Sequence, residues 1–177
     1  MSEIVTEIQV DGCPEAAEEF RALLVEKLSD PAQTAALFIL SLDTFLSQPQ
    51  RGLEMIALLR GQTELDETER KYQLTPLAEQ AYLPRAYYKG ALAENGYTPA
   101  LPRTVVIKYD KKRGKDKNKK TVYIGCGGTG TYRPITLKRL KKRAARKFLQ
   151  SRRVQEEAWF VTEYPSILLP VKKPENS

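Results

Sequence analysis

Hydrophobic residues recur three and four positions apart through the first half of the chain. This spacing is typical of helices that bury one face, and it predicts helices over residues 14–28, 31–46 and 49–60. The second of these runs is apolar nearly all round, so we expect it to be the central, buried helix. Asp66, followed three residues later by Glu69, indicates a capped fourth helix.

The second half of the chain is richer in β-branched and aromatic residues. It predicts a strand over 104–109 with a partner over 121–124, and a third strand over 135–137. Residues 138–153 then return to helical spacing, with Lys and Arg filling the polar face. The runs 159–161 and 167–169 predict two short strands, or one strand broken by a proline. We therefore expect an α+β fold: about four N-terminal helices packed on a small, mainly antiparallel sheet, with one further basic helix between C-terminal strands.

These elements predict one compact domain between two short tails. The expected parts are a flexible N-terminus over 1–13, a single α+β domain over 14–172 and a flexible tail over 173–177. Within the domain we expect a helical part over 14–81, a crossover over 82–102 and a sheet part over 103–172.

The crossover is the least repetitive stretch of the chain, and its prolines, glycines and tyrosines are typical of an ordered irregular connection. The residues of the crossover that form a recognisable motif are Tyr82, Pro84, Tyr87, Gly90, Ala91, Asn95, Tyr97, Thr98 and Pro99. Further motifs are Leu53-Glu54-Met55-Ile56, Arg133-Pro134-Ile135-Thr136-Leu137, Trp159-Phe160 and Ser166-Ile167-Leu168-Leu169. Together, over roughly residues 35–172, they resemble a family of small bacterial domains of unknown function. The resemblance implies a fold class and no activity, and it does not extend to the basic stretches 111–120 and 138–155.

The composition excludes several kinds of catalytic and metal-binding site. The chain has no histidine, which removes Ser-His and Cys-His nucleophiles, imidazole metal sites and the usual general acid or base near neutral pH. Cys13 and Cys126 are too few for a disulfide framework, and each is expected to be an inert thiol. We expect no catalytic residue, no metal and no cofactor, although the sequence does not exclude catalysis by Glu, Lys, Tyr or Cys. The start of the chain lacks the layout of a signal peptide and no apolar run reaches membrane-spanning length, so we expect a cytoplasmic protein without membrane insertion.

Charge is divided unevenly along the chain. Residues 1–99 carry 16 acids and 8 bases, a net charge of −8, whereas residues 100–177 carry 6 acids and 21 bases, a net charge of +15. Such asymmetry indicates that the basic half faces a polyanion, or that the acidic and basic halves attract each other within or between molecules.

Two basic segments supply most of this positive charge. One is a loop with Lys111, Lys112, Arg113, Lys115, Lys117, Lys119 and Lys120. The other is the predicted helix with Arg139, Lys142, Arg143, Arg146, Lys147, Arg152 and Arg153. Together they could hold phosphates without reading sequence, and Tyr109, Tyr123 and Tyr132 could offer stacking faces to bases. The plainer interpretation is a solvated surface.

The sequence leaves other functions open. A pocket lined by Tyr82, Arg85, Tyr87, Tyr88 and Tyr97 could receive a protein or peptide, although residues of this kind more often fix packing. An enzyme of a small acidic substrate would have to use Arg85, Arg133 or Lys138. Our main hypothesis is a non-catalytic module that binds a polyanion such as nucleic acid. The sequence does not indicate an oligomeric state.

One glycine motif is also compatible with nucleotide binding. Residues 125–130 spell G-x-G-x-x-G after a predicted strand. The dinucleotide-binding version needs a helix to start there, and here a strand is expected instead. We therefore predict a plain turn.

Overall fold

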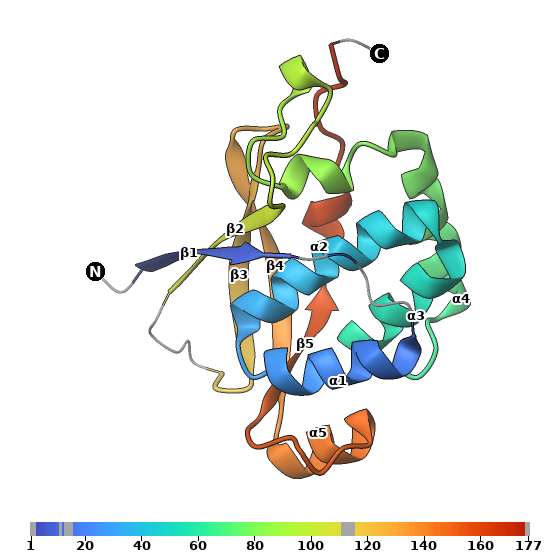
Figure 1. The fold of residues 1–177 in the computed structure, drawn as a ribbon, viewed down its shortest axis with the longest axis vertical. Coiled ribbons are helices and arrows are strands. Elements are labelled where there is room, and N and C mark those ends of the chain that lie inside the picture. Colours follow the sequence, from blue (N-terminus) through green and yellow to red (C-terminus); the bar gives the residue numbers. More distant parts are fainter. Residues whose placement is uncertain (1–2, 11, 13–15, 111–115, 176–177) are drawn as a thin grey trace.

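The computed structural model describes residues 3–10, 12, 16–110 and 116–175. Five strands and five α-helices make up its regular structure within these residues (Figure 1). The strands are β1 Glu3–Gln9, β2 Thr104–Asp110, β3 Lys119–Cys126, β4 Thr131–Leu140 and β5 Ala158–Glu163. The helices are α1 Ala17–Lys27, α2 Pro31–Ser47, α3 Pro49–Leu59, α4 Glu67–Glu69 and α5 Lys142–Leu149. None of the helices in this part of the chain combines the length and the apolar content needed to cross a bilayer.

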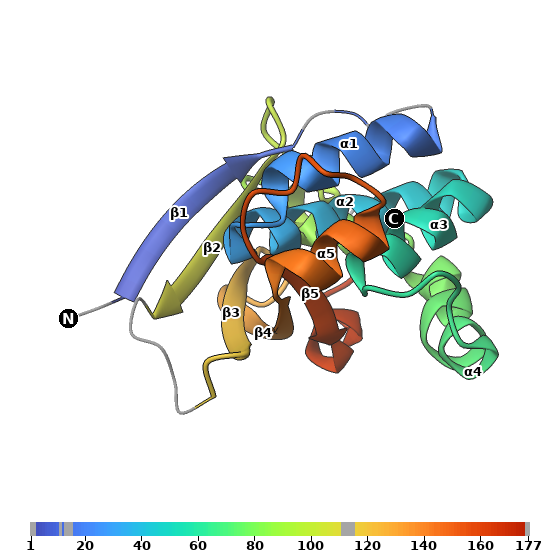
Figure 2. The ribbon, with the colours of Figure 1, turned by 90° about the horizontal axis from the view of Figure 1, so that it is seen from below.

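The five strands form one antiparallel sheet in the order β1-β2-β3-β4-β5. The helices lie on one side of this sheet, and its other face is left open (Figure 2). The predicted α+β class is confirmed, because the helices and the strands segregate into two layers.

Helix α2 is the centre of the core, as its apolar sequence predicts. It contacts β1, β2, β3 and β5 below it and α3 beside it. Its start follows the expected chemistry, since the Asp30 side chain accepts a hydrogen bond from the Ala32 N–H at 2.9 Å and Pro31 occupies the first turn. The predicted helix over 49–60 is also confirmed, and it ends before Gly61, whose φ is +68°.

The first residues form part of the sheet, which corrects the expectation of a flexible N-terminus over 1–13. Strand β1 pairs with β2 from Glu3 opposite Asp110 to Gln9 opposite Thr104. Ile8 and Val10 are buried, whereas the alternate residues are exposed or half-buried. The apolar alternation is short and lies among acids, so its signal as a strand is weak in the sequence.

The fourth helix is shorter than its cap suggests. Asp66 does cap it, accepting from the Thr68 N–H at 2.7 Å, but α4 ends at Glu69 and continues as a wider turn and a 3-10 turn to Gln80. Glu69 does not turn back to the cap, because its buried carboxylate accepts from the Tyr164 hydroxyl and lies 3.0 Å from Arg60 Nε. This ion pair ties the ends of α3 and α4 to the segment after β5.

The basic helix predicted over 138–153 is shorter and starts later. Residues up to Leu140 belong to β4, and only Lys142–Leu149 is helical. Leu137 is buried in the sheet, while Ala145 and Leu149 form the buried side of α5. Pairing with β3 and β5 thus prevails over the helical spacing at the start of this segment.

The C-terminal segment also differs from the prediction. Residues 165–168 form a 3-10 turn and no second strand. Further on, the Glu175 N–H donates to Ala93 O at 3.0 Å, so part of the predicted flexible tail is bonded to the crossover.

The β3–β4 hairpin is docked on the crossover through its glycine turn, and no helix begins there. The Gly127 N–H donates to Ala86 O at 2.8 Å, and a Cβ at Gly127 would lie 1.9 Å from Ala91 O. A Cβ at Gly128 would lie 2.5 Å from Val171 Cβ. The turn predicted from the glycine motif is confirmed, and its glycines serve close backbone approach.

Replacing Gly127 with alanine should push the hairpin away from the crossover. We expect Gly127→Ala to lower the free energy of unfolding by about 3 kcal/mol, measured by urea denaturation. Gly12→Ala is the matched control, because no atom lies within 4 Å of a Cβ there. A Gly127→Ala protein as stable as the Gly12→Ala protein would contradict this account of the turn.

Candidate functional site

Strand pairing brings the described part of the basic loop and the basic helix together at one end of the sheet. Lys119 at the start of β3 lies directly opposite Lys138 near the end of β4. Beyond this pair the Arg139 N–H donates to Asn118 O at 2.8 Å. Because α5 follows β4 directly, residues 116–118 and the basic helix lie at the same end of the molecule.

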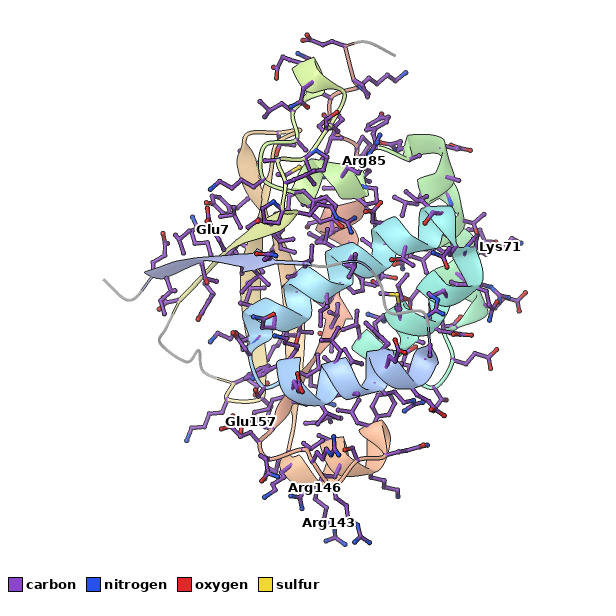
Figure 3. All side chains as sticks on the ribbon, in the orientation of Figure 1. Glu7, Lys71, Arg85, Arg143, Arg146 and Glu157 are labelled. Carbon is purple, nitrogen blue, oxygen red and sulfur yellow. The ribbon has the colours of Figure 1, made fainter. Side chains whose placement is uncertain are left out.

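We call the exposed basic residues of this region the cationic end. Its members are Lys117, Lys119, Lys138, Lys141, Lys142, Arg143, Lys147, Arg152 and Arg153. Figure 3 shows Arg143 at this end, while Lys71 and Arg85 lie elsewhere, over the helical half and the crossover. Residues 117–155 contain 13 Lys and Arg and not one Asp or Glu, so the charge is locally unbalanced along the chain.

Among the described residues, carboxylates lie near the cationic end but form no ion pair with it. Asp110, Asp116 and Glu157 line one hollow together with Lys117 and Lys119. Within the described residues, no member of it lies within 4.0 Å of a carboxylate oxygen. Arg139 beside it does pair with Glu157, at 3.5 Å, and is half-buried. Elsewhere, ion pairs join Arg60 to Glu69, Lys89 to Glu7, Arg103 to Asp43, Lys108 to Glu3 and Lys172 to Glu175.

The remaining predicted polyanion-binding residues are not part of the cationic end. Four of them, Lys111, Lys112, Arg113 and Lys115, lie outside the described residues. The Lys120 ammonium rests 4.6 Å from the centroid of the Tyr109 ring. Arg146 is half-buried and donates from Nε to Val154 O at 2.8 Å, so it holds the segment after α5.

Two of the three predicted stacking tyrosines lie on the open face of the sheet. Tyr123 and Tyr132 keep 40% and 38% of their surface exposed. Tyr109 instead lies opposite Ile4 on the side that the helices cover. The sequence did not single out Lys108, whose ammonium lies 4.7 Å from the Tyr132 ring centroid. Strand alternation could have placed it, since Lys108 faces Tyr123 across the β2–β3 pair.

The crossover tyrosines lie mostly inside the protein. The Tyr87 hydroxyl donates to Ile167 O at 2.5 Å and accepts from Arg133 NH1 at 3.0 Å. Tyr97 is fully buried and donates to Lys172 O, and its ring stacks on Tyr82 at 5.5 Å. These hydroxyls therefore already have backbone partners, as is usual where tyrosines fix packing.

The other crossover residues are divided between packing and solvent. Tyr88 is buried and donates to Asp43 at 3.2 Å, and the same carboxylate oxygen accepts from Arg103 at 3.1 Å. Arg85 is exposed. Tyr87 and Tyr88 line one hollow of about 250 Å³, and the lining of that hollow does not include Tyr82, Arg85 or Tyr97.

Buried Arg133 has no carboxylate partner among the described residues. Its guanidinium donates to Leu169 O at 2.6 Å and to Pro170 O at 2.8 Å, in addition to Tyr87. It points to the covered side of β4, whereas Lys138 is exposed at the other end of that strand. Arg85, Arg133 and Lys138 thus do not converge on one cavity. No cluster of three metal-ligating side chains occurs within the described residues either.

A groove of about 790 Å³ lies between α1 and the segment that leads from α5 to β5. Arg153 lines it together with Glu18, Glu26 and Glu156. Charges of both signs therefore meet there, and Leu24 and Val154 give it an apolar floor.

Burial of the tyrosines predicts a loss of stability at alkaline pH. Burial in the core, the largest cause, raises the pKa of Tyr87, Tyr88 and Tyr164 above the model-peptide value of 10.0, and the carboxylates of Asp43 and Glu69 add to the shift for the latter two. Because the folded pKa is raised, this stability is fully present below pH 10 and is lost as unfolded tyrosines ionise above it. We expect the unfolding free energy to fall by up to about 1.4 kcal/mol per pH unit for each such tyrosine.

The measurement is urea denaturation at a series of pH values from about 9 to about 11. Tyr87→Phe removes one ionisable group, so its stability should fall less steeply with pH than that of the unmodified protein, although it starts lower. Tyr72→Phe, at a side chain 67% exposed, is the control and should keep the original slope. Equal slopes for Tyr87→Phe and the unmodified protein would exclude a raised pKa at Tyr87.

Comparison with known proteins agrees with the sequence motifs of the crossover and the sheet. No curated protein and no solved structure matches the chain significantly. A family described as a domain of unknown function, DUF6935, matches residues 12–175, which include the crossover, α1 to α5 and all strands after β1. The chain therefore belongs to the DUF6935 family.

Proposed function

We propose that this domain binds a polyanion, with nucleic acid as the first candidate, through the cationic end. The observation that supports it best is the pair Lys119 and Lys138, two like charges directly opposite each other on neighbouring strands. Like charges in this position destabilise a sheet. No described carboxylate within ion-pair distance offsets this cost, whereas an external row of phosphates would.

Helix α5 extends this surface. Lys142, Arg143 and Lys147 are exposed, while Ala145 and Leu149 hold the helix on the protein. Phe148 supports this contact, with its ring edge-on to Phe160 at 5.4 Å. The cations thus project from a fixed element, which reduces the side-chain ordering needed when a polyanion binds.

A charge-reversal variant tests this function. We expect Lys142→Glu, Arg143→Glu and Lys147→Glu together to weaken nucleic-acid binding, measured by fluorescence anisotropy at about 50 mM and about 200 mM salt. Loss of three phosphate contacts should reduce the slope of log affinity against log salt by about 2 to 3.

The matched control is Arg70→Glu, Lys71→Glu and Arg85→Glu, three exposed residues outside the cationic end. It changes the net charge by the same amount, so it should keep most of the salt slope if binding is local. Equal effects of the two variants would show that only net charge matters. Absence of salt-dependent binding by the unmodified protein would refute the proposed function.

A further inference from the structure

The open face of the sheet carries an ordered series of side chains between β3 and β4. Starting from the cationic end, the pairs across these strands are Lys119 with Lys138, Thr121 with Thr136, Tyr123 with Pro134 and Gly125 with Tyr132. Cations therefore lie at one end of this strip, two hydroxyls follow, and two aromatic rings lie at the other end.

The rings are placed where a ligand could reach them. Tyr123 and Tyr132 are each more than one third exposed, and no helix covers this face (Figure 2). Tyr132 is opposite Gly125, and a Cβ at that glycine would be in ordinary contact with ring atom Cε1 at 3.6 Å, so the Tyr132 ring lies against β3. Solvent exposure of two rings on one face costs free energy unless a partner covers them.

A hollow borders the end of the strip where the Tyr132 ring lies. It has a volume of about 250 Å³ and lies between the crossover and the sheet, with Leu92, Val106, Gly125 and Tyr132 among its lining residues. Its apolar and glycine lining suits the flat face of a planar ring, and such a ring would meet Tyr132 there.

Acids lie on both sides of the strip. Glu3 and Glu7 are on β1, which β2 separates from the strip, Asp110 ends β2, and exposed Glu163 on β5 is opposite Thr136. Lys89 and Lys108 partly neutralise the β1 acids, whereas within the described residues β3 and β4 carry Lys and Arg and no acid. A chain of phosphates would therefore be favoured along β3 and β4 and disfavoured beside them.

We infer that the preferred ligand is single-stranded nucleic acid, whose bases stack on Tyr123 and Tyr132 while its phosphates continue toward Lys119 and Lys138. This rests on the proposed function and specifies its ligand. A duplex hides the faces of its bases, so exposed rings would add affinity for unpaired bases only. Diagonal neighbours on adjacent strands are about 7 Å apart, about twice the rise per base in a stacked strand, so each ring would take one base of an extended chain.

Lys108 would also take part in binding. Its ammonium rests over the Tyr132 ring at 4.7 Å and is 3.9 Å from Glu3, and its side chain is partly exposed. A base arriving at Tyr132 displaces this flexible side chain, which then lies within reach of a phosphate.

The test compares ring removal with charge reversal on two ligands. The probes are a labelled pyrimidine single strand of about 12 nucleotides and its duplex, measured by fluorescence anisotropy. Tyr123→Ala and Tyr132→Ala should each weaken single-strand binding by about fivefold to 100-fold and change duplex binding by less than about twofold. Tyr123→Phe and Tyr132→Phe should retain single-strand binding, since stacking needs the ring and not the hydroxyl.

Tyr72→Ala is the matched control, because Tyr72 is 67% exposed and lies in the helical half. Circular dichroism and urea denaturation verify that each variant is folded, and Tyr123→Val or Tyr132→Val, which remove the ring but keep a strand-forming side chain, replace an alanine variant that is not. Unchanged single-strand affinity in both folded alanine variants would overturn this inference, and so would equal losses on single strand and duplex.

The same experiment tests the proposed function separately from the preference for single strands. If the Lys142→Glu, Arg143→Glu, Lys147→Glu variant loses affinity for both ligands while the tyrosine variants do not, the cationic end binds polyanions and the rings have no role. If that charge-reversal variant loses nothing, the proposed function itself is refuted.

Discussion

Docking of the β3–β4 hairpin on the crossover is the contact on which the arrangement of the molecule depends. A hydrogen bond from Gly127 to Ala86 holds the turn, and Arg133 fixes the strand that leaves it. Burying a guanidinium without a carboxylate is costly unless all its donors are satisfied. Here two backbone carbonyls and the Tyr87 hydroxyl accept from it, and they belong to the crossover and to the C-terminal segment. One buried charge thus joins three parts of the chain.

This contact also determines where the cations lie. Because the turn end of the hairpin is fixed on the crossover, its open end must point away from it, and the register places Lys119 against Lys138 there. Helix α5 begins two residues after β4 and is therefore carried to the same end. Apart from Arg133, the docked part of the hairpin is uncharged, whereas Lys119 and Lys138 at its open end are exposed to water.

Local chemistry in the sequence predicted some features well and missed others for physical reasons. The buried helix α2 was predictable because its apolar residues, its Asp30 cap and Pro31 all agree. Strand β1 was not predictable, since only one of its faces meets the core and the exposed face carries Glu3 and Glu7. In the segment from Leu137 to Leu140, helical and strand spacing both fit, and hydrogen bonds to two neighbouring strands favoured the strand.

The basic segments of the candidate site could be predicted from the sequence, but their position next to each other in the fold could not. The two basic segments stand out in the sequence by composition alone. Their meeting depends on the β3–β4 register, which is set by long-range pairing and by the glycine turn. Side-chain alternation along β2 places Tyr109 on the covered face, whereas Tyr123 and Tyr132 lie on the open face, so the three rings cannot bind one ligand.

Strand β1 precedes residue 12, where the match to the family begins, yet it pairs along the whole of β2. A fragment cut at that boundary would leave the backbone groups of β2 without partners along one border of the sheet. Such a border accepts extended peptides or further copies of itself. Strand β1 covers this edge of β2, and a fragment trimmed to the family limits would expose it.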